Sequence, residues 1–143
     1  MADGAHKFAI SLTTPDGAVF DDEAEMVIVP GAAGEIGVLA RHAPLIALLK
    51  AGSTRIYTNR DAGEVQEFAT GPGFFSVELD RAIALVDSAV NVREIDPAAA
   101  EARLKEAQEE LERLDSGESE ADRWQVEQRI KAAENQLSAA GRT

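Results

Sequence analysis

The 143-residue sequence contains no cysteine, so neither a disulfide bond nor thiolate chemistry is available to it. Long apolar runs are also missing, because the longest falls far short of the roughly 18 residues needed to span a bilayer. The opening residues MADGAHK carry neither the apolar core of a secretory signal nor an arginine-rich transit pattern. We therefore expect no direct insertion into a membrane, and a reducing compartment fits the lack of cysteine.

Basic residues are scarce, with 14 lysines and arginines against 26 acidic residues and a formal net charge of −12. Nucleic-acid phosphates and anionic lipid surfaces both attract lysine and arginine, so this balance argues against both as partners. A basic protein surface is the natural electrostatic partner, although plain solubility accounts equally well for the charge.

Patterns that carry catalysis are absent as well. The two histidines, His6 and His42, lack the H-x-x-x-H spacing of a zinc site, and no G-x-S-x-G nucleophile motif occurs. The acidic cluster within residues 21–25 lacks a calcium-loop pattern, so we interpret it as a solvated loop. We expect no catalytic site, metal or cofactor; a paired-carboxylate hydrolase stays open, because carboxylates are plentiful and their pairing is spatial.

Short strands separated by turn signals are predicted for residues 7 to about 92. The turn at Asp61-Ala62-Gly63 joins two alternating runs and predicts a hairpin, and Leu79-Asp80-Arg81 predicts another tight connection. Many short strands at close spacing are typical of a β-sandwich or barrel. The predicted strands cover residues 7–14, 24–30, 35–39, 45–49, 53–58, 64–69, 74–79 and 81–87.

Near Ile95 the hydrophobic period becomes helical, with Asp96 suited to the N-cap and Pro97 to the first helical position. Two stripes at helical spacing follow, separated by a loop around Gly117, and Ser119 is predicted to open the second helix. They predict an antiparallel helical hairpin. The apolar stripes comprise Ala100, Leu104, Ala107, Leu111 and Leu114 in the first helix, and Val126, Ile130, Ala133, Leu137 and Ala140 in the second.

The two periods predict an α+β chain of two domains, a β-sandwich over residues 1–94 and a helical hairpin over residues 95–143. Alanine is common in the seam of the hairpin, and it buries less apolar area than leucine would. We expect the hairpin to be only marginally stable alone and to rest against the sandwich or another subunit.

The most informative stretch is Gly31–Leu45, which reads GAAGEIGVLARHAPL between two apolar runs. Its glycines recur every third residue, which fits tight turns in a β region. The spacing matches neither a P-loop nor a dinucleotide fingerprint. The segment beginning VIVP and running through this stretch resembles the signature of the epsilon subunit of F-type ATP synthases, whose mitochondrial counterpart is called delta, and the resemblance covers nearly the whole chain.

This resemblance implies a sandwich of two five-stranded sheets in a noncatalytic rotor subunit that links gamma to the c-ring. It implies a peripheral position on the cytoplasmic face of the bacterial inner membrane. The hairpin would regulate ATP hydrolysis and reach the alpha and beta subunits, partly through basic residues of its second helix. The interface residues it implies are Glu35, His42, Gly34 and Gly37, and the regulatory basic residues of the second helix are Arg123, Arg129 and Lys131.

Some members of that family bind ATP between the helices through an I/L-D-x-x-R-A motif. Here Ala99 stands where the motif has arginine, and Ala132 and Gln136 stand where ATP-binding members have arginines. We therefore expect no bound nucleotide. From the residues alone, two other interpretations remain: an adaptor unrelated to the synthase and, less favoured, a small carboxylate-dependent hydrolase.

Overall fold

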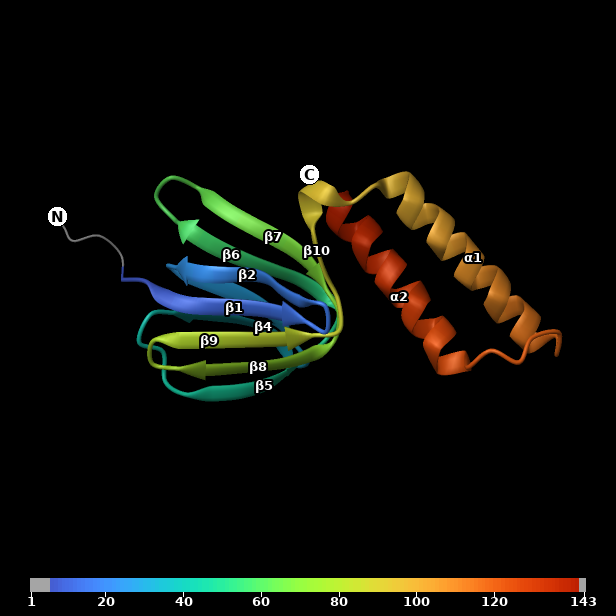
Figure 1. Cartoon of the computed structure of the whole chain (residues 1–143), viewed down its shortest axis with the longest axis horizontal. Coiled ribbons are helices and arrows are strands. Elements are labelled where there is room, and N and C mark those ends of the chain that lie inside the picture. Colours follow the sequence, from blue (N-terminus) through green and yellow to red (C-terminus); the bar gives the residue numbers. More distant parts are fainter. Residues whose placement is uncertain (1–5, 142–143) are drawn as a thin grey trace. The chain divides into compact units, whose positions relative to one another are not determined.

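A computed structural model describes residues 6–141, in which strands precede two helices (Figure 1). Every strand in the predicted ranges is present, and two more occur, β2 and β10. The elements are β1 (Phe8–Thr14), β2 (Gly17–Ala24), β3 (Met26–Gly31), β4 (Gly34–Leu39), β5 (Leu45–Leu49), β6 (Gly52–Asn59), β7 (Glu64–Thr70), β8 (Gly73–Glu78), β9 (Arg81–Val86), β10 (Ala89–Asn91), the 3-10 helix η1 (Val92–Glu94), α1 (Pro97–Asp115) and α2 (Arg123–Ala140).

Hydrogen bonds link the strands in the order β10-β7-β6-β3-β5-β8-β9-β1-β2, and β4 pairs with β3 beside this path. The connection between β3 and β5 is a single residue pair, Gly31 with Leu49. This narrow link divides the strands into two five-stranded layers, β2-β1-β9-β8-β5 and β10-β7-β6-β3-β4. The predicted β-sandwich is therefore confirmed, with one parallel pair, β1 with β9, among the antiparallel ones.

The core lies between these layers and is built from alternate residues of their strands. In β1, Phe8, Ile10 and Leu12 are buried while the residues between them are half-buried. Phe75 of the same layer packs in one apolar cluster with residues of the other layer such as Ile56. Because side chains alternate across a strand, the opposite face of each strand is left for solvent or for a partner.

The prediction of a solvated loop around residues 21–25 is wrong, because residues 17–24 form strand β2. Its only buried side chains are Phe20 and Ala24, four positions apart, and the acidic residues between them are exposed. Two anchors at this spacing give no clear alternation in the sequence. β10 was missed because it is only three residues long.

The predicted hairpins are confirmed. β6 pairs with β7 across the Asp61-Ala62-Gly63 turn, where Gly63 adopts a φ of 69°, a left-handed conformation that glycine reaches without strain. β8 pairs with β9 from Glu78 and Arg81 onward.

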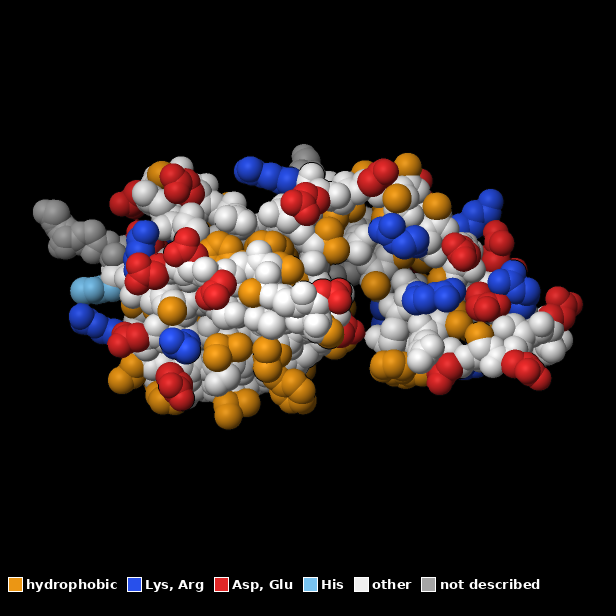
Figure 2. Space-filling model, viewed as in Figure 1, with side chains coloured by type: hydrophobic (Ala, Val, Ile, Leu, Met, Phe, Trp, Pro, Cys, Tyr) orange, Lys and Arg blue, Asp and Glu red, His pale blue; other side chains and the backbone are white. Residues whose placement is uncertain are grey.

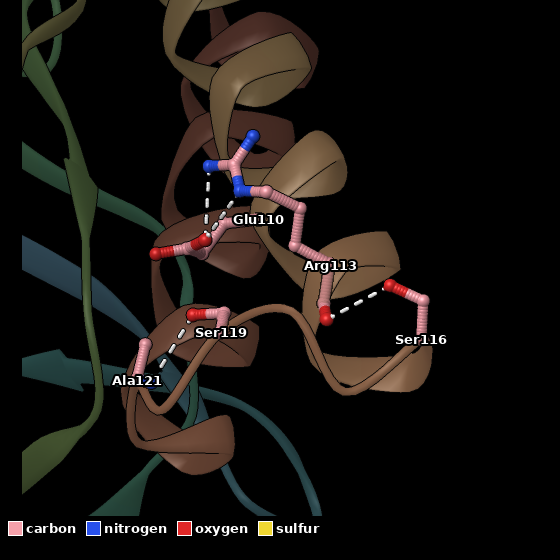
Figure 3. A network of polar contacts seen from close by, with 5 residues as sticks. All are labelled: Glu110, Arg113, Ser116, Ser119 and Ala121. Atoms are coloured by element: carbon pink, nitrogen blue, oxygen red, sulfur yellow. Dashed lines mark hydrogen bonds and ion pairs between the residues drawn. The ribbon is translucent and has the colours of Figure 1, made fainter.

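The helical hairpin is confirmed, but its second start is not where the sequence indicated. Asp96 caps α1 by accepting hydrogen bonds from the amides of Ala98 and Ala99. Asp122, not Ser119, caps α2, because its side chain accepts hydrogen bonds from the amides of Trp124 and Gln125. Ser119 instead accepts one bond from the amide of Ala121 within the loop (Figure 3). A carboxylate placed next to the helix outcompetes the earlier hydroxyl for this role.

Ion pairs and hydrogen bonds support the loop end of this hairpin. Arg113 pairs with Glu110 one turn earlier, and the hydroxyl of Ser116 donates to the carbonyl of Arg113 (Figure 3). Arg123 lies 2.6 Å from a carboxylate oxygen of Asp115 and ties the start of α2 to the end of α1. The hydrogen bond to Asp115, and then the attraction between the two charges, raise the pKa of Arg123.

Most buried side chains of the helices lie in the predicted stripes, but near the end of α2 the buried residue is Ala139 and not the predicted Ala140. Ala100 and Ala107 of α1, and Val126 and Ala133 of α2, are buried, while their stripe leucines are half-buried. Small side chains therefore form the most tightly enclosed part of the seam.

Internal contacts divide the chain into two compact units, Met1–Asn91 and Val92–Thr143. The boundary predicted after residue 94 falls at the end of η1, just inside the second unit. Since the sandwich core contains no residue of the second unit, we expect residues 1–94 to fold alone. A chain truncated there should give a cooperative thermal transition with β-type circular dichroism, and an unfolded product would contradict the two-domain prediction.

The capping assignment predicts a difference between two similar substitutions. Asp122→Ala should destabilise the hairpin by about 1 kcal/mol, because two amides at the start of α2 lose their acceptor. Ser119→Ala, the matched control, should cost less, because it removes a single loop hydrogen bond. Denaturant titration followed by helical circular dichroism measures both; equal losses would show that Asp122 is not the cap that matters.

Candidate functional site

The glycine-rich stretch forms the β3–β4 hairpin, with Ala32 and Ala33 at its tip between the paired Gly31 and Gly34. Gly34 has a φ of +143°, and a Cβ on Gly31 would lie 2.6 Å from the carbonyl oxygen of Gly34. Both positions therefore require glycine for conformation or close approach. The tip bonds to β5, because the amide of Ala32 donates to the carbonyl of Leu48.

Glu35 follows this tip on β4, and its side chain is 62% exposed. Its carboxylate accepts a hydrogen bond of 3.1 Å from Arg55 of β6, which reaches across β3. An exposed pair of this type contributes at most about 1 kcal/mol to stability. Its main effect is to fix the direction of the carboxylate on the outer face.

His42 lies in the loop after β4 and is half-buried. Its Nδ1 is 2.7 Å from the carbonyl oxygen of Ala43. The neighbouring Arg41 has a φ of 64°, rare outside glycine, and its amide donates to the carbonyl of Leu79. The loop around His42 is thus fastened to the β8–β9 turn.

Glu35 and His42, both implied as interface residues by the resemblance, lie at opposite ends of β4. Glu35 pairs with Pro30 beside the hairpin tip, whereas His42 follows Leu39 at the opposite end of β4. At about 3.3 Å per residue, β4 places about 13 Å between the Cα atoms of Glu35 and Leu39. The structure brings Glu35 together with Gly34 and Gly37 on β4, but it does not bring His42 to them.

An apolar patch on the outer face of β5, β8 and β9 was missed by the sequence reasoning. Leu48 lies opposite Phe74, and Phe74 lies opposite Leu85, so the three form one row across the strands. Their residues are 59%, 58% and 52% exposed, and Ile46 beside them is 80% exposed. Figure 2 shows hydrophobic side chains gathered over this part of the sandwich. We call these four residues the outer patch.

A contiguous exposed apolar area is typical of a surface that binds another protein. The signal was present in the sequence: LIALL and FFSVEL carry apolar residues at both odd and even positions. Such runs indicate strands covered on both faces, whereas a free outer face would alternate.

The three basic residues expected to regulate hydrolysis are all exposed on α2, but their surroundings differ. Arg123 is paired with Asp115. Arg129 lines a cavity of about 290 Å³ between the helices, together with Glu106. Lys131 is a surface residue of the same helix.

The same cavity contains two of the three positions where the nucleotide motif is broken. Ala132 and Gln136 line it beside Arg103, and the guanidinium of Arg103 donates to the side-chain oxygen of Gln136 at 2.6 Å. Asp96, which matches the motif, caps α1. These residues do not fit a triphosphate, because one arginine already has an acceptor and Glu106 adds like charge.

Within residues 6–141, no group of three or more histidine and acidic side chains is placed to hold a metal ion. No helix in this part of the chain is long and apolar enough to cross a membrane.

Residues 7–92 match the model of the β-sandwich domain of the ATP synthase delta/epsilon chain. The chain belongs to the ATP synthase delta/epsilon family. Among similar family members, the ATP synthase epsilon chain of Desulforamulus reducens is 35% identical over 92% of this chain and 95% of its own length. That of Gloeothece citriformis is 34% identical over 93% of this chain and 94% of its own.

Solved structures support the fold of this family member. A chain of the Euglena gracilis mitochondrial ATP synthase superposes with a TM-score of 0.74 at 22% identity, covering 96% of this chain and 84% of that one. A chain from the Tetrahymena thermophila mitochondrial central stalk and c-ring gives 0.57 at 11% identity, covering 96% and 99%.

For this delta/epsilon family member we predict no ATP binding at micromolar concentration. Each charge-assisted hydrogen bond to phosphate that the missing arginines would have made is worth roughly 1.5–3 kcal/mol. Isothermal titration of the full chain with ATP measures this directly. A gain-of-function control combines Ala99→Arg, Ala132→Arg and Gln136→Arg; a micromolar dissociation constant for the unchanged chain would contradict the prediction.

Proposed function

We propose that this chain is the noncatalytic rotor subunit of a proton-translocating ATP synthase, where it joins the gamma subunit to the c-ring. Its membership of the delta/epsilon family carries this proposal. The outer patch supports it, because a chain that acts by assembly needs an apolar docking surface. Catalysis then belongs to other subunits, and this chain transmits force between its partners.

The sandwich suits such a task because its core is continuous. Buried side chains from both layers pack in one cluster, and close-packed interiors have low compressibility. A partner that pushes on the outer patch therefore meets a body that moves as a unit. In this proposal gamma covers the outer patch, where Phe74 is the largest side chain and Ile46 the most exposed.

The two ends of β4 give this proposal two further contacts. Glu35 and the glycines of the hairpin tip form one, and His42 with the loop fastened to Leu79 forms the other. A subunit held between gamma and the c-ring needs contacts at separated places. We assign Glu35 and His42 to such contacts without giving either a catalytic role.

We place the chain on the cytoplasmic face of a bacterial inner membrane, held there through the complex. Its similarity to epsilon chains of Desulforamulus reducens and Gloeothece citriformis supports a bacterial enzyme. The acidic charge of the chain disfavours direct adsorption to anionic lipid, so attachment through protein partners is the consistent route.

Binding to gamma tests the docking surface. Phe74→Glu should weaken the affinity of the full chain for recombinant gamma by about tenfold or more, because a charge would be buried in an apolar contact. Trp124→Glu is the matched control, since Trp124 is 66% exposed but lies on α2. Calorimetry or interferometry supplies the dissociation constants. If the unchanged chain does not bind gamma, the rotor function itself fails and an unrelated adaptor becomes the better interpretation.

Single substitutions test the two ends of β4. Glu35→Ala and His42→Ala should leave the melting temperature nearly unchanged, because Glu35 is exposed and His42 is only half-buried. Both should weaken the coupling of proton pumping to ATP hydrolysis in the reconstituted enzyme. A drop in melting temperature for His42→Ala with coupling retained would make His42 a structural residue.

Removal of residues 95–143 tests the proposed regulatory hairpin. We expect weak, ATP-insensitive inhibition, because Asp115 already holds Arg123, one of the three basic residues of α2. Hydrolysis by the reconstituted enzyme should rise by less than tenfold on removal. A larger increase, equivalent to more than about 1.4 kcal/mol of inhibitory coupling, would identify the hairpin as a strong brake.

A further inference from the structure

The edge strands of the two layers are β2, β5, β10 and β4. β4 differs from the other three in how little protects its outer edge. β2 carries acidic side chains, β10 is only three residues long, and β5 meets β3 at Leu49. β4 is six residues long and pairs only with β3 among the described strands. It contains no proline or lysine, and its single charged residue is Glu35. Proteins usually protect such edges, so an open one is informative.

The register identifies which backbone groups of β4 point outward. The amide of Lys50 donates to the carbonyl of Pro30, so Pro30 turns its backbone away from β4. Hydrogen-bonded and non-hydrogen-bonded pairs alternate along an antiparallel ladder. Pro30, Ile28 and Met26 therefore all belong to non-hydrogen-bonded pairs, in which the backbone groups of the partner residue on β4 point away from β3. The amides and carbonyls of Glu35, Gly37 and Leu39 therefore face away from β3.

Side chains along β4 leave this edge accessible. A Cβ placed on Gly37 would meet nothing within 4 Å, and Gly34 likewise has open space around it. The one charge that could repel an incoming strand is drawn the other way, because Glu35 is bonded to Arg55 across β3. The hydrogen bond thus keeps the carboxylate over the sheet and away from the open edge.

Beside this edge lies a cavity of about 360 Å³ that connects it to the outer patch. Ile36 of β4 lines one side, and Ala47 and Leu48 of β5 line the other. Leu48 is also a member of the outer patch, so the two surfaces are continuous. Glu35 also lines this cavity, but every other lining residue is glycine, alanine, isoleucine or leucine, so an apolar side chain fits its chemistry.

We propose that the open edge of β4 binds an extended segment of the gamma subunit, which adds a strand to the sandwich and places an apolar side chain in the adjacent cavity. This inference rests on the proposed rotor function and adds the mode of contact. Main-chain hydrogen bonds supply the affinity in such strand addition, and the pocket beside the edge supplies the specificity.

Amide hydrogen exchange of the full chain, with and without recombinant gamma, tests this assignment. The amides of Glu35, Gly37 and Leu39 should exchange quickly in the free chain and at least about tenfold more slowly in the complex, because each gains an acceptor. Slowing confined to the outer patch, with gamma bound, would overturn strand addition while leaving the rotor function intact. Failure of gamma to bind would instead defeat the function on which the inference rests.

Two variants at one position separate the backbone from the side chain. Gly37→Pro removes an outward amide without touching the bonds to β3, and it should weaken gamma binding by about tenfold. Gly37→Ala keeps the amide and enters open space, so its affinity should stay within about threefold. Equal affinities for both variants would overturn the proposal. If the proline variant does not fold, the exchange experiment on the unchanged chain decides. Protection of the same amides in a dimer of the chain alone would reassign the edge to a second copy.

Discussion

The structure depends on the apolar contact between the two sheets. Alternate side chains such as Ile10, Phe75 and Ile56 fill the space between the layers, so each strand satisfies its need for burial with one face only. The outer faces of the sheets, their edge strands and the loops are then available for contacts with partners. The row of Leu48, Phe74 and Leu85 can remain exposed because the core is filled without those side chains.

Much of this architecture could be predicted from local patterns. Alternation marked most of the strands, and the Asp96-Pro97 pair marked the start of α1, because both signals come from neighbouring residues. β2 could not be found in this way, since its anchors Phe20 and Ala24 are four positions apart and its pairing partner is β1. The start of α2 was misplaced because two residues that favour caps lie close together, and geometry decided for Asp122.

The candidate surfaces were less predictable than the fold. Glu35 and His42 are close in sequence, but an intervening strand separates them, and nothing in the local pattern reveals its length in space. The pairing of Glu35 with Arg55 joins residues 20 positions apart across β3. The edge of β4 is open because no described strand other than β3 pairs with it. This follows from the full set of strand pairings and not from the local sequence.

The single pair between Gly31 and Leu49 has a mechanical meaning. In a closed barrel, a full ladder of backbone hydrogen bonds would resist sliding at this seam, but here the two sheets share almost none of that restraint. Shear between them is opposed mainly by interlocking side chains in the interior. The elastic stiffness of the sandwich under torsional load is therefore set by how well its core is packed, and a cavity made by a single large-to-small replacement, such as at Phe75, would soften the whole element.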